Sequence, residues 1–351
     1  MKKFSHFLLC LLLASGMSTS AVADFKAGSD AASKGDFATA QKEWQTAATA
    51  GNADAQFNLG ALLLSGRAGK ADIRNGVKWL EKASANGHTE ASYALGMIYF
   101  NGSGNELKMD HQRAFKAFEL AAAKGHPPSQ FSAGMLLLNG QGMKHDPSAA
   151  VAWLTKAADQ GYVMAQYNLG LFHAGQQGAK GKAFKWFLKA AEQGLPQAQH
   201  TVARMYMEGQ GTPRDLAQAK SWFLRAADKG SVESQYGAGF LLYAGMGEQR
   251  NPAEALKWFE RAAKNWDRNA QFRLGQMYLE GDGVAKNLTE AYKWLDLAAS
   301  GGHEDAHYLR AAAGLQMPDA DTERAHRLAQ EWFDANHKTP HKHQDLKPHG
   351  H

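Results

Sequence analysis

The sequence predicts an all-α solenoid of helical hairpins stacked side by side, and three observations support this fold. A pattern of helix, glycine-rich turn and second helix occurs seven times, most clearly over residues 270–302. Aligned on a small residue of the first helix, usually glycine, successive copies are 36, 38, 36, 33, 36 and 36 residues apart. A tryptophan of the second helix keeps the same period in six copies. One hairpin per unit at a fixed period of this size is typical of repeat solenoids.

Residues 1–23 are predicted to be a signal peptide that is cleaved on export to the periplasm. Lys2 and Lys3 precede an apolar run over residues 7–14, and residues 21–23 supply the small side chains of a cleavage site. The apolar run is shorter than the ~20 residues that span a bilayer, so we expect no transmembrane segment after cleavage. A permanent N-terminal anchor is the alternative.

The composition is that of a globular chain without thiol chemistry after export. Hydrophobic residues make up 44% and charged residues 21% of the 351 positions, which argues against a disordered chain. The one cysteine, Cys10, lies in the signal peptide behind two bulky leucines, so we expect neither lipidation nor a disulfide. The formal net charge of +5 loses two units with the signal peptide and is spread along the chain, which argues against a nucleic-acid partner.

Residues 24–53 are predicted to form N-terminal capping helices. Phe37, Ala40 and Trp44 have helical spacing, and Gly51 follows them as a C-cap residue would. Such a segment hides the face that a missing neighbour would otherwise cover.

The first helices of the seven repeats, within residues 54–302, share one pattern. We number each helix from the small residue near its start, which is position 0: Ala55, Ala91, Ser129, Ala165, Ala198, Ser234 and Ala270. Apolar or small residues fill positions 0, 2, 4, 5, 7, 8 and 9, so positions −1, 3, 6 and 10 are expected to face outward. Position 5 is glycine in six repeats. Because glycine costs about 1 kcal/mol inside a helix, another helix must approach too closely there for a Cβ atom.

Position 1 is Gln or Ser in every repeat and lies within the buried arc. Buried amides need hydrogen-bond partners. We therefore expect this side chain to tie neighbouring hairpins together.

The second helices are amphipathic. Trp153, Leu154 and Ala157 share one face, whereas charged residues such as Lys257 and Arg261 lie on the opposite face. The charged face is expected to be a solvated outer wall.

These residues resemble the Sel-one-like repeat (SLR), a relative of the tetratricopeptide repeat. The resemblance rests on A-x-[YF]-x-L-G-x-x-Y-x-x-G-x-G followed by A-x-x-W-[LF]-x-x-A-A-x-x-G, over residues 54–302. It implies a right-handed α/α superhelix of about seven hairpins, whose first helices line the concave surface. The chain departs from the pattern at Ala117 in place of Trp, at Ala203 in place of Gly and at Trp266 in place of the terminal Gly.

Residues 303–336 are predicted to form C-terminal capping helices. They contain one further first helix over residues 306–313 and a final amphipathic helix that begins at Asp319 or Asp321. The tail, residues 337–351, is rich in Pro and His and is predicted to be disordered. Its weak candidate ligands for Zn²⁺, Ni²⁺ or Cu²⁺ are His341, His343, His349 and His351. A polar tail without a metal is the alternative.

Residues that recur in every repeat are expected to maintain the packing of the hairpins. Partner specificity is therefore expected at the positions where the repeats differ. Position 6 mixes large apolar and polar side chains, and apolar or Met-rich surfaces commonly bind peptides. The predicted partner-binding residues of the concave surface are Met97, Met135, Leu171, Arg204, Glu208, Phe240, Arg273 and Gln276. Alternatively, the curvature of the superhelix covers these side chains with the adjacent repeat.

The sequence contains no catalytic motif such as H-E-x-x-H or G-x-S-x-G. We therefore predict a non-catalytic periplasmic scaffold, monomeric and without a cofactor, that binds an envelope protein or peptide. One alternative is a binding protein or hydrolase for cell-wall fragments or β-lactams, which the resemblance implies for some exported relatives. Those relatives carry a disulfide in each repeat, and this chain has no cysteines for one after export. The other alternative is metal binding through the His-rich tail.

Overall fold

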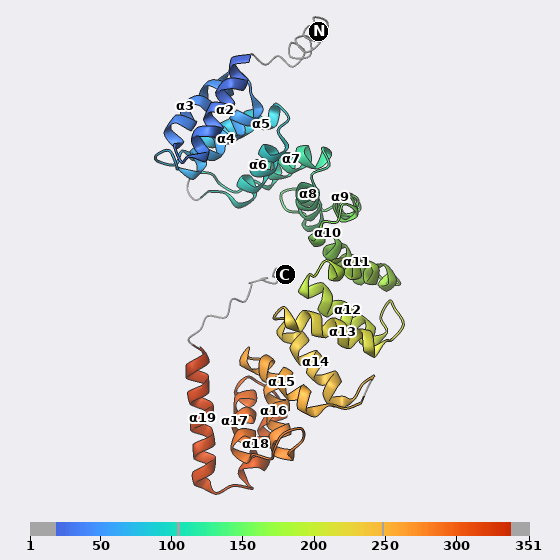
Figure 1. Cartoon of the computed structure of the whole chain (residues 1–351). Helices are drawn as coiled ribbons and strands as arrows, with labels where there is room; N and C mark the ends of the chain where they lie inside the picture. Colours follow the sequence, from blue (N-terminus) through green and yellow to red (C-terminus); the bar gives the residue numbers. More distant parts are fainter. Residues whose placement is uncertain (1–18, 104–105, 248, 338–351) are drawn as a thin grey trace, which may run out of the picture. The chain divides into compact units, whose positions relative to one another are not determined.

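The computed structural model describes residues 19–337 apart from 104–105 and 248. Within these residues it shows eighteen helices, α2 to α19, joined by turns, with one isolated β-bridge between Ser103 and Leu107 (Figure 1). The predicted all-α fold of paired helices is confirmed.

The chain divides into two compact units, and the boundary in the sequence lies between Leu169 and Gly170. The helices of the first unit are α2 (Thr19–Ser33), α3 (Phe37–Thr49), α4 (Ala53–Ser65), α5 (Ile73–Ala85), α6 (Thr89–Asn101), α7 (His111–Ala123), α8 (Pro127–Asn139) and α9 (Pro147–Asp159). The boundary falls inside α10 (Val163–Ala174). The helices of the second unit are α11 (Lys180–Glu192), α12 (Pro196–Glu208), α13 (Leu216–Asp228), α14 (Val232–Ala244), α15 (Pro252–Lys264), α16 (Arg268–Glu280), α17 (Leu288–Ser300), α18 (Ala306–Gly314) and α19 (Asp319–His337).

Consecutive helices pack as hairpins. In the first unit the pairs are α2/α3, α4/α5, α6/α7 and α8/α9, and in the second unit they include α12/α13, α14/α15 and α16/α17. Helix α2 begins at Thr19, upstream of the predicted cleavage site after residue 23. Residues 1–18 lie outside the described part of the chain, so signal-peptide cleavage stays a prediction.

The glycine at position 5 is the point of closest approach within a hairpin. A Cβ atom on Gly60 would lie 2.9 Å from Leu80 Cγ, and one on Gly96 would lie 2.4 Å from Phe118 Cδ1. Real Cβ atoms do not approach carbon atoms this closely, and close-packed interiors cannot yield the missing space cheaply. The reason predicted for glycine at this position is confirmed.

The glutamine at position 1 ties each hairpin to the preceding one. Gln56 Nε2 donates to the carbonyl oxygen of Ala48 at the end of α3 (3.0 Å). Its Oε1 accepts from Asn86 Nδ2, just past the end of α5 (2.8 Å). Gln130 makes the same two bonds, to Ala122 O (3.2 Å) and from Gln160 Nε2 (2.8 Å). The predicted tie between hairpins is confirmed.

Trp266 occupies a backbone position that glycine holds elsewhere. Glycines end the second helices with φ between +80° and +94°, and Trp266 has φ +67° in the same place. A left-handed backbone costs a non-glycine residue roughly 1–2 kcal/mol. The Trp266 ring contacts two rings of α19, Trp332 at 5.0 Å and Phe333 at 5.3 Å between centroids. These contacts offset the backbone strain.

The C-terminal helices depart from the hairpin pattern. Helix α18 is a further first helix, with Ala306 fully buried at position 0. Helix α19 lies along α17, as Figure 1 shows, instead of pairing with α18. Asp296 of α17 is buried and joins both helices, because its carboxylate accepts from Arg310 Nη1 of α18 (2.5 Å) and lies 2.7 Å from His326 Nδ1 of α19.

Candidate protein-interaction surfaces

The first helices expose a narrower arc than the sequence predicts. Positions −1 and 10 are mostly exposed, but every position 3 side chain is half-buried. Position 3 is therefore less exposed than positions −1 and 10. Gly237 shows the reason, because a Cβ atom there would lie 2.8 Å from Phe223 Cε1 on the preceding hairpin. Position 6 ranges from half-buried to exposed.

The apolar residues of the predicted site differ in accessibility. Met97 of α6 is 38% exposed and Leu171 of α10 is 49% exposed. Met135 of α8 and Phe240 of α14 are half-buried, and the Phe240 ring stacks on Tyr236 with centroids 6.3 Å apart. Met97 and Met135 belong to the first unit, whereas Leu171 and Phe240 belong to the second.

The polar residues of the site pair within their own helices. In α12, Arg204 Nη2 lies 3.0 Å from Glu208 Oε1, and Gln210 Nε2 donates to Glu208 Oε2 (2.6 Å). In α16, Arg273 Nη1 donates to Gln276 Oε1 (2.8 Å). The structure thus brings together two pairs of the predicted site residues, each on the surface of one helix.

A second surface feature lies on the second helices and was not predicted. The tryptophan of these helices is covered by a cation three residues later, with the charged group 4.0–4.6 Å from the ring centroid. The pairs are Trp79/Lys82, Trp153/Lys156, Trp186/Lys189, Trp222/Arg225 and Trp258/Arg261. A cation over an indole face is attractive. The spacing W-x-x-[KR] carries this signal in the sequence.

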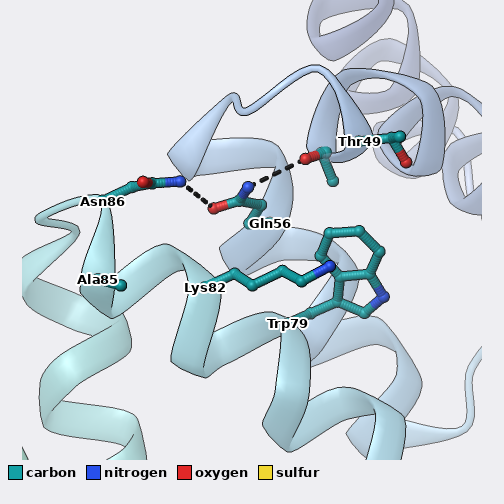
Figure 2. A pocket seen from close by; sticks show the side chains of 7 residues that line it. Thr49, Gln56, Trp79, Lys82, Ala85 and Asn86 are labelled. Atoms are coloured by element: carbon teal, nitrogen blue, oxygen red, sulfur yellow. Dashed lines mark hydrogen bonds between the residues drawn. The ribbon is translucent and has the colours of Figure 1, made fainter.

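The Trp79 furrow is a hollow on this outer wall, between the end of α3 and the exposed side of α5. It has a volume of about 470 Å³ and is lined by Ala48, Thr49, Gln56, Trp79, Lys82, Ala85 and Asn86. Figure 2 shows Lys82 extended across the Trp79 ring and the bonded pair Gln56 and Asn86 beside it. The furrow therefore offers an aromatic surface, an ammonium group and two amides.

Two half-buried histidines in the second unit have lowered pKa values. Burial lowers the pKa of His200, whose Nδ1 lies 2.9 Å from Ser234 Oγ. Burial also lowers the pKa of His303, which stacks on Phe272 with ring centroids 4.0 Å apart. His200 stands at position 2, where the other repeats have Phe or Tyr. Both rings serve as packing groups, and the fold favours their neutral forms.

Comparison with known families identifies the repeats. A model of the Sel1 repeat matches residues 127–162, 163–195, 196–231, 232–265 and 268–303. The chain is a Sel1 repeat protein. A model of plant tetratrico peptide repeats also matches residues 45–120, where the N-terminal hairpins lie.

Solved structures resemble this Sel1 repeat protein over most of its length. A protective antigen of uropathogenic Escherichia coli strains, which displays an SLR fold, has a TM-score of 0.78 and 29% identity, covering 94% of this chain and 71% of that one. A Sel1 repeat protein from Oxalobacter formigenes has a TM-score of 0.65 and 28% identity, covering 84% and 90%. An exopolysaccharide production negative regulator of Rhizobium meliloti is 42% identical over 60 residues, which are 17% of this chain and 22% of that protein.

The part of the Sel1 repeat protein that the structure describes shows neither a metal-binding cluster nor a membrane-spanning helix. No group of three or more His, Cys, Asp or Glu side chains there is arranged to hold a metal ion. The same residues contain no helix long and apolar enough to cross a bilayer. The tail candidates lie outside the described residues: His341, His343, His349 and His351.

Proposed function

We propose that this Sel1 repeat protein is a non-catalytic scaffold of the periplasm that binds an envelope protein or peptide along its first helices. The observation that supports the proposal is the contrast between positions on those helices. Positions 1 and 5 recur and are buried in the packed core of the repeats, whereas position 6 varies and is half-buried or exposed. Accessible residues that differ between otherwise equal repeats can select a partner without disturbing the fold.

The side chains at position 6 suit a protein partner. Met97 and Leu171 are exposed, and burying such a side chain contributes roughly 1.5–3 kcal/mol. Methionine adapts its shape to the surface that it meets. Arg204 and Glu208 add charge, and because their mutual ion pair is exposed, a partner can replace it at small cost.

The relatives support an interaction role. Sel1 repeat proteins mediate protein–protein interactions, and the Rhizobium relative is named as a negative regulator. We infer that the chain acts by binding and regulation, with exopolysaccharide control as one setting in which to look for the partner.

Export and binding are tested by separate experiments. N-terminal sequencing of protein from a periplasmic fraction is expected to give Asp24 as the first residue. Retention in the cytoplasm with Met1 in place contradicts the export proposal.

Binding is tested by quantitative capture from envelope extracts. Met97→Asp, Met135→Asp and Phe240→Asp are expected to lower recovery of specific partners at least tenfold, because a carboxylate there must be desolvated against the partner. Leu120→Asp is the matched control, since Leu120 is 56% exposed but lies on the second helix α7, away from the first-helix surface. Equal recovery by all four variants contradicts the assignment of the surface.

A further inference from the structure

Two furrows of the outer wall, one in each unit, are built from corresponding residues, and the first of them is an open hollow. The first is the Trp79 furrow. The second lies 215 residues further along, where Gln271, Trp294 and Ala263 stand in place of Gln56, Trp79 and Ala48. Its frame is the same, because Gln271 Nε2 donates to Ala263 O (3.4 Å) as Gln56 does to Ala48.

The second furrow is occupied by α19. Trp332 of α19 contacts Trp294, the counterpart of Trp79, with ring centroids 5.4 Å apart. Trp332 and Phe333 also contact Trp266, which replaces Gly51 of the first furrow. Helix α19 buries Ala325 and Ala329 on the same face. The chain itself thus shows which ligand this furrow accepts: an amphipathic helix with small residues and an aromatic pair.

The rims of the two furrows differ in charge. Lys82 at the first furrow is replaced by Leu297 at the second, where Leu297 is 6% exposed. Arg74, Lys78 and Lys82 are exposed along α5, and the nearby acidic side chain, Glu81, lies 3.4 Å from Arg113, so the first rim carries a net positive charge. In α19 the aromatic pair stands between Glu331 and Asp334. A helix with that arrangement matches the basic rim better than it matches the second furrow.

Several other repeats carry acidic residues at the places that Thr49 and Ala85 hold in the Trp79 furrow. Asp159 in the third repeat and Asp228 in the fifth repeat replace Ala85. Asp228 also lines the furrow of the following, sixth repeat, where it stands in the place of Thr49. There its carboxylate lies 4.0 Å from Arg261, the counterpart of Lys82. In the Trp79 furrow these two places hold the small neutral residues Thr49 and Ala85, which leave the hollow open.

We propose that the Trp79 furrow binds an amphipathic helix of a partner protein, with two adjacent aromatic residues flanked by carboxylates. The aromatic pair packs on Trp79 and against the small side chains of Thr49 and Ala85. The carboxylates pair with Lys82 and Lys78. This surface is separate from positions 6 and 10 of the first helices, so it does not depend on the function proposed above.

The test uses the full chain and a fluorescein-labelled peptide with the sequence of residues 319–337, measured by fluorescence anisotropy. We expect saturable binding to the wild type. Ala85→Asp, which copies the third and fifth repeats, and Lys82→Glu are expected to weaken it at least tenfold. Both residues are exposed, so these variants keep the fold. A peptide with alanine in place of Trp332 and Phe333 is expected to lose binding.

Two protein controls locate the site. Lys156→Glu alters the equivalent lysine of the third repeat, and Met97→Asp alters the first-helix surface; both are expected to bind the peptide as the wild type does. Equal affinity of the wild type and Ala85→Asp, equal weakening by Lys156→Glu, or no saturation up to ~1 mM peptide overturns the proposal. Sedimentation of the wild type is expected to show a monomer. A dimer that Ala85→Asp dissociates would place a second copy's α19 in the furrow and overturn the assignment to a partner protein.

Discussion

The two units share one frame but complete its hydrogen bonds to different degrees. In the first unit, the Oε1 atoms of Gln56 and Gln130 accept from amides of Asn86 and Gln160. In the second unit, the Oε1 atoms of Gln199 and Gln235 are buried without a hydrogen-bond partner. A buried acceptor without a partner costs roughly 1–3 kcal/mol.

The residue after the second helix explains this difference. Lys229 follows α13, and its Nζ donates to Gly194 O (2.6 Å) instead of to Gln199. Asn265 follows α15, and its Nδ2 donates to Arg261 O (2.9 Å) instead of to Gln235. Repeats with the same pattern thus differ in the hydrogen bonds of their position 1 glutamine because of one residue outside that pattern, and Gln199 and Gln235 of the second unit make fewer of these bonds than Gln56 and Gln130.

The largest predicted effect tests whether the two units share the same close packing at the position 5 glycine. Gly96→Val in the first unit and Gly239→Val in the second place side-chain atoms where Cβ alone would lie 2.4 Å from Phe118 Cδ1 and 2.8 Å from Phe259 Cε1. Each variant is expected to lose about 3 kcal/mol of unfolding free energy by overpacking. Urea denaturation followed by circular dichroism measures this loss. A loss in only one unit would show that the two frames are not equivalent.

The second prediction compares the glutamine ties directly. Gln130→Leu removes two bonds and is expected to cost about 2 kcal/mol, whereas Gln235→Leu removes one bond and an unpaired acceptor and is expected to cost less than about 1 kcal/mol. Urea midpoints of the two variants check this order. Lys229→Gln is the complementary variant, because it offers an amide to Gln199 as Gln160 does to Gln130, and it is expected to stabilise the second unit. The reverse order of costs would contradict the comparison.

Mild acid is predicted to weaken the second unit. Burial lowers the pKa of His200 in the folded chain, so the unfolded chain binds a proton first, near pH 6.5. Stability therefore falls as the pH drops below that value toward the folded-state pKa. Urea midpoints at pH 7.5 and 5.5 are expected to differ more for the wild type than for His200→Tyr, which has the ring that Tyr93 and Tyr236 supply at this position. His303 contributes in the same direction in both proteins. An identical pH dependence for the two proteins would exclude His200 as a source.

The smallest predicted effect concerns the surface of the second unit. Arg204→Ala breaks an ion pair with Glu208. The side chain of Arg204 is 57% exposed and that of Glu208 is 32% exposed. We expect a loss of at most about 0.5 kcal/mol, and less at high salt. Thermal denaturation at two salt concentrations measures it. A loss above about 1 kcal/mol would show that this pair belongs to the frame and not to the partner surface.

The sequence predicts the hairpins well because each carries its own local signals. Gly60, Gln56 and the aromatic residue at position 2 recur at fixed spacing, and each does in the structure what its chemistry requires. The place of α19 could not be predicted in this way. Its apolar face indicates burial, but only the three-dimensional structure shows that Trp332 packs on Trp294 of α17.

The surfaces were predicted less completely than the frame. Position 3 was expected to be exposed because helical periodicity ignores the preceding hairpin, which covers Gly237. The pairing of Trp79 with Lys82 is local to α5, but the furrow beside them depends on the end of α3, which is distant in sequence. The repeat spacing predicted the tryptophans, whereas neither their pairing with cations nor the hollow was predicted.

Hydrogen exchange of the complex with a captured partner tests most directly whether variable first-helix residues form the binding surface. The proposed function predicts slowed exchange in α6, α8 and α14 on binding, with the ends of α9 and α13 unchanged. Slowed exchange in the second helices alone, with α6, α8 and α14 exchanging as in the free chain, would contradict it.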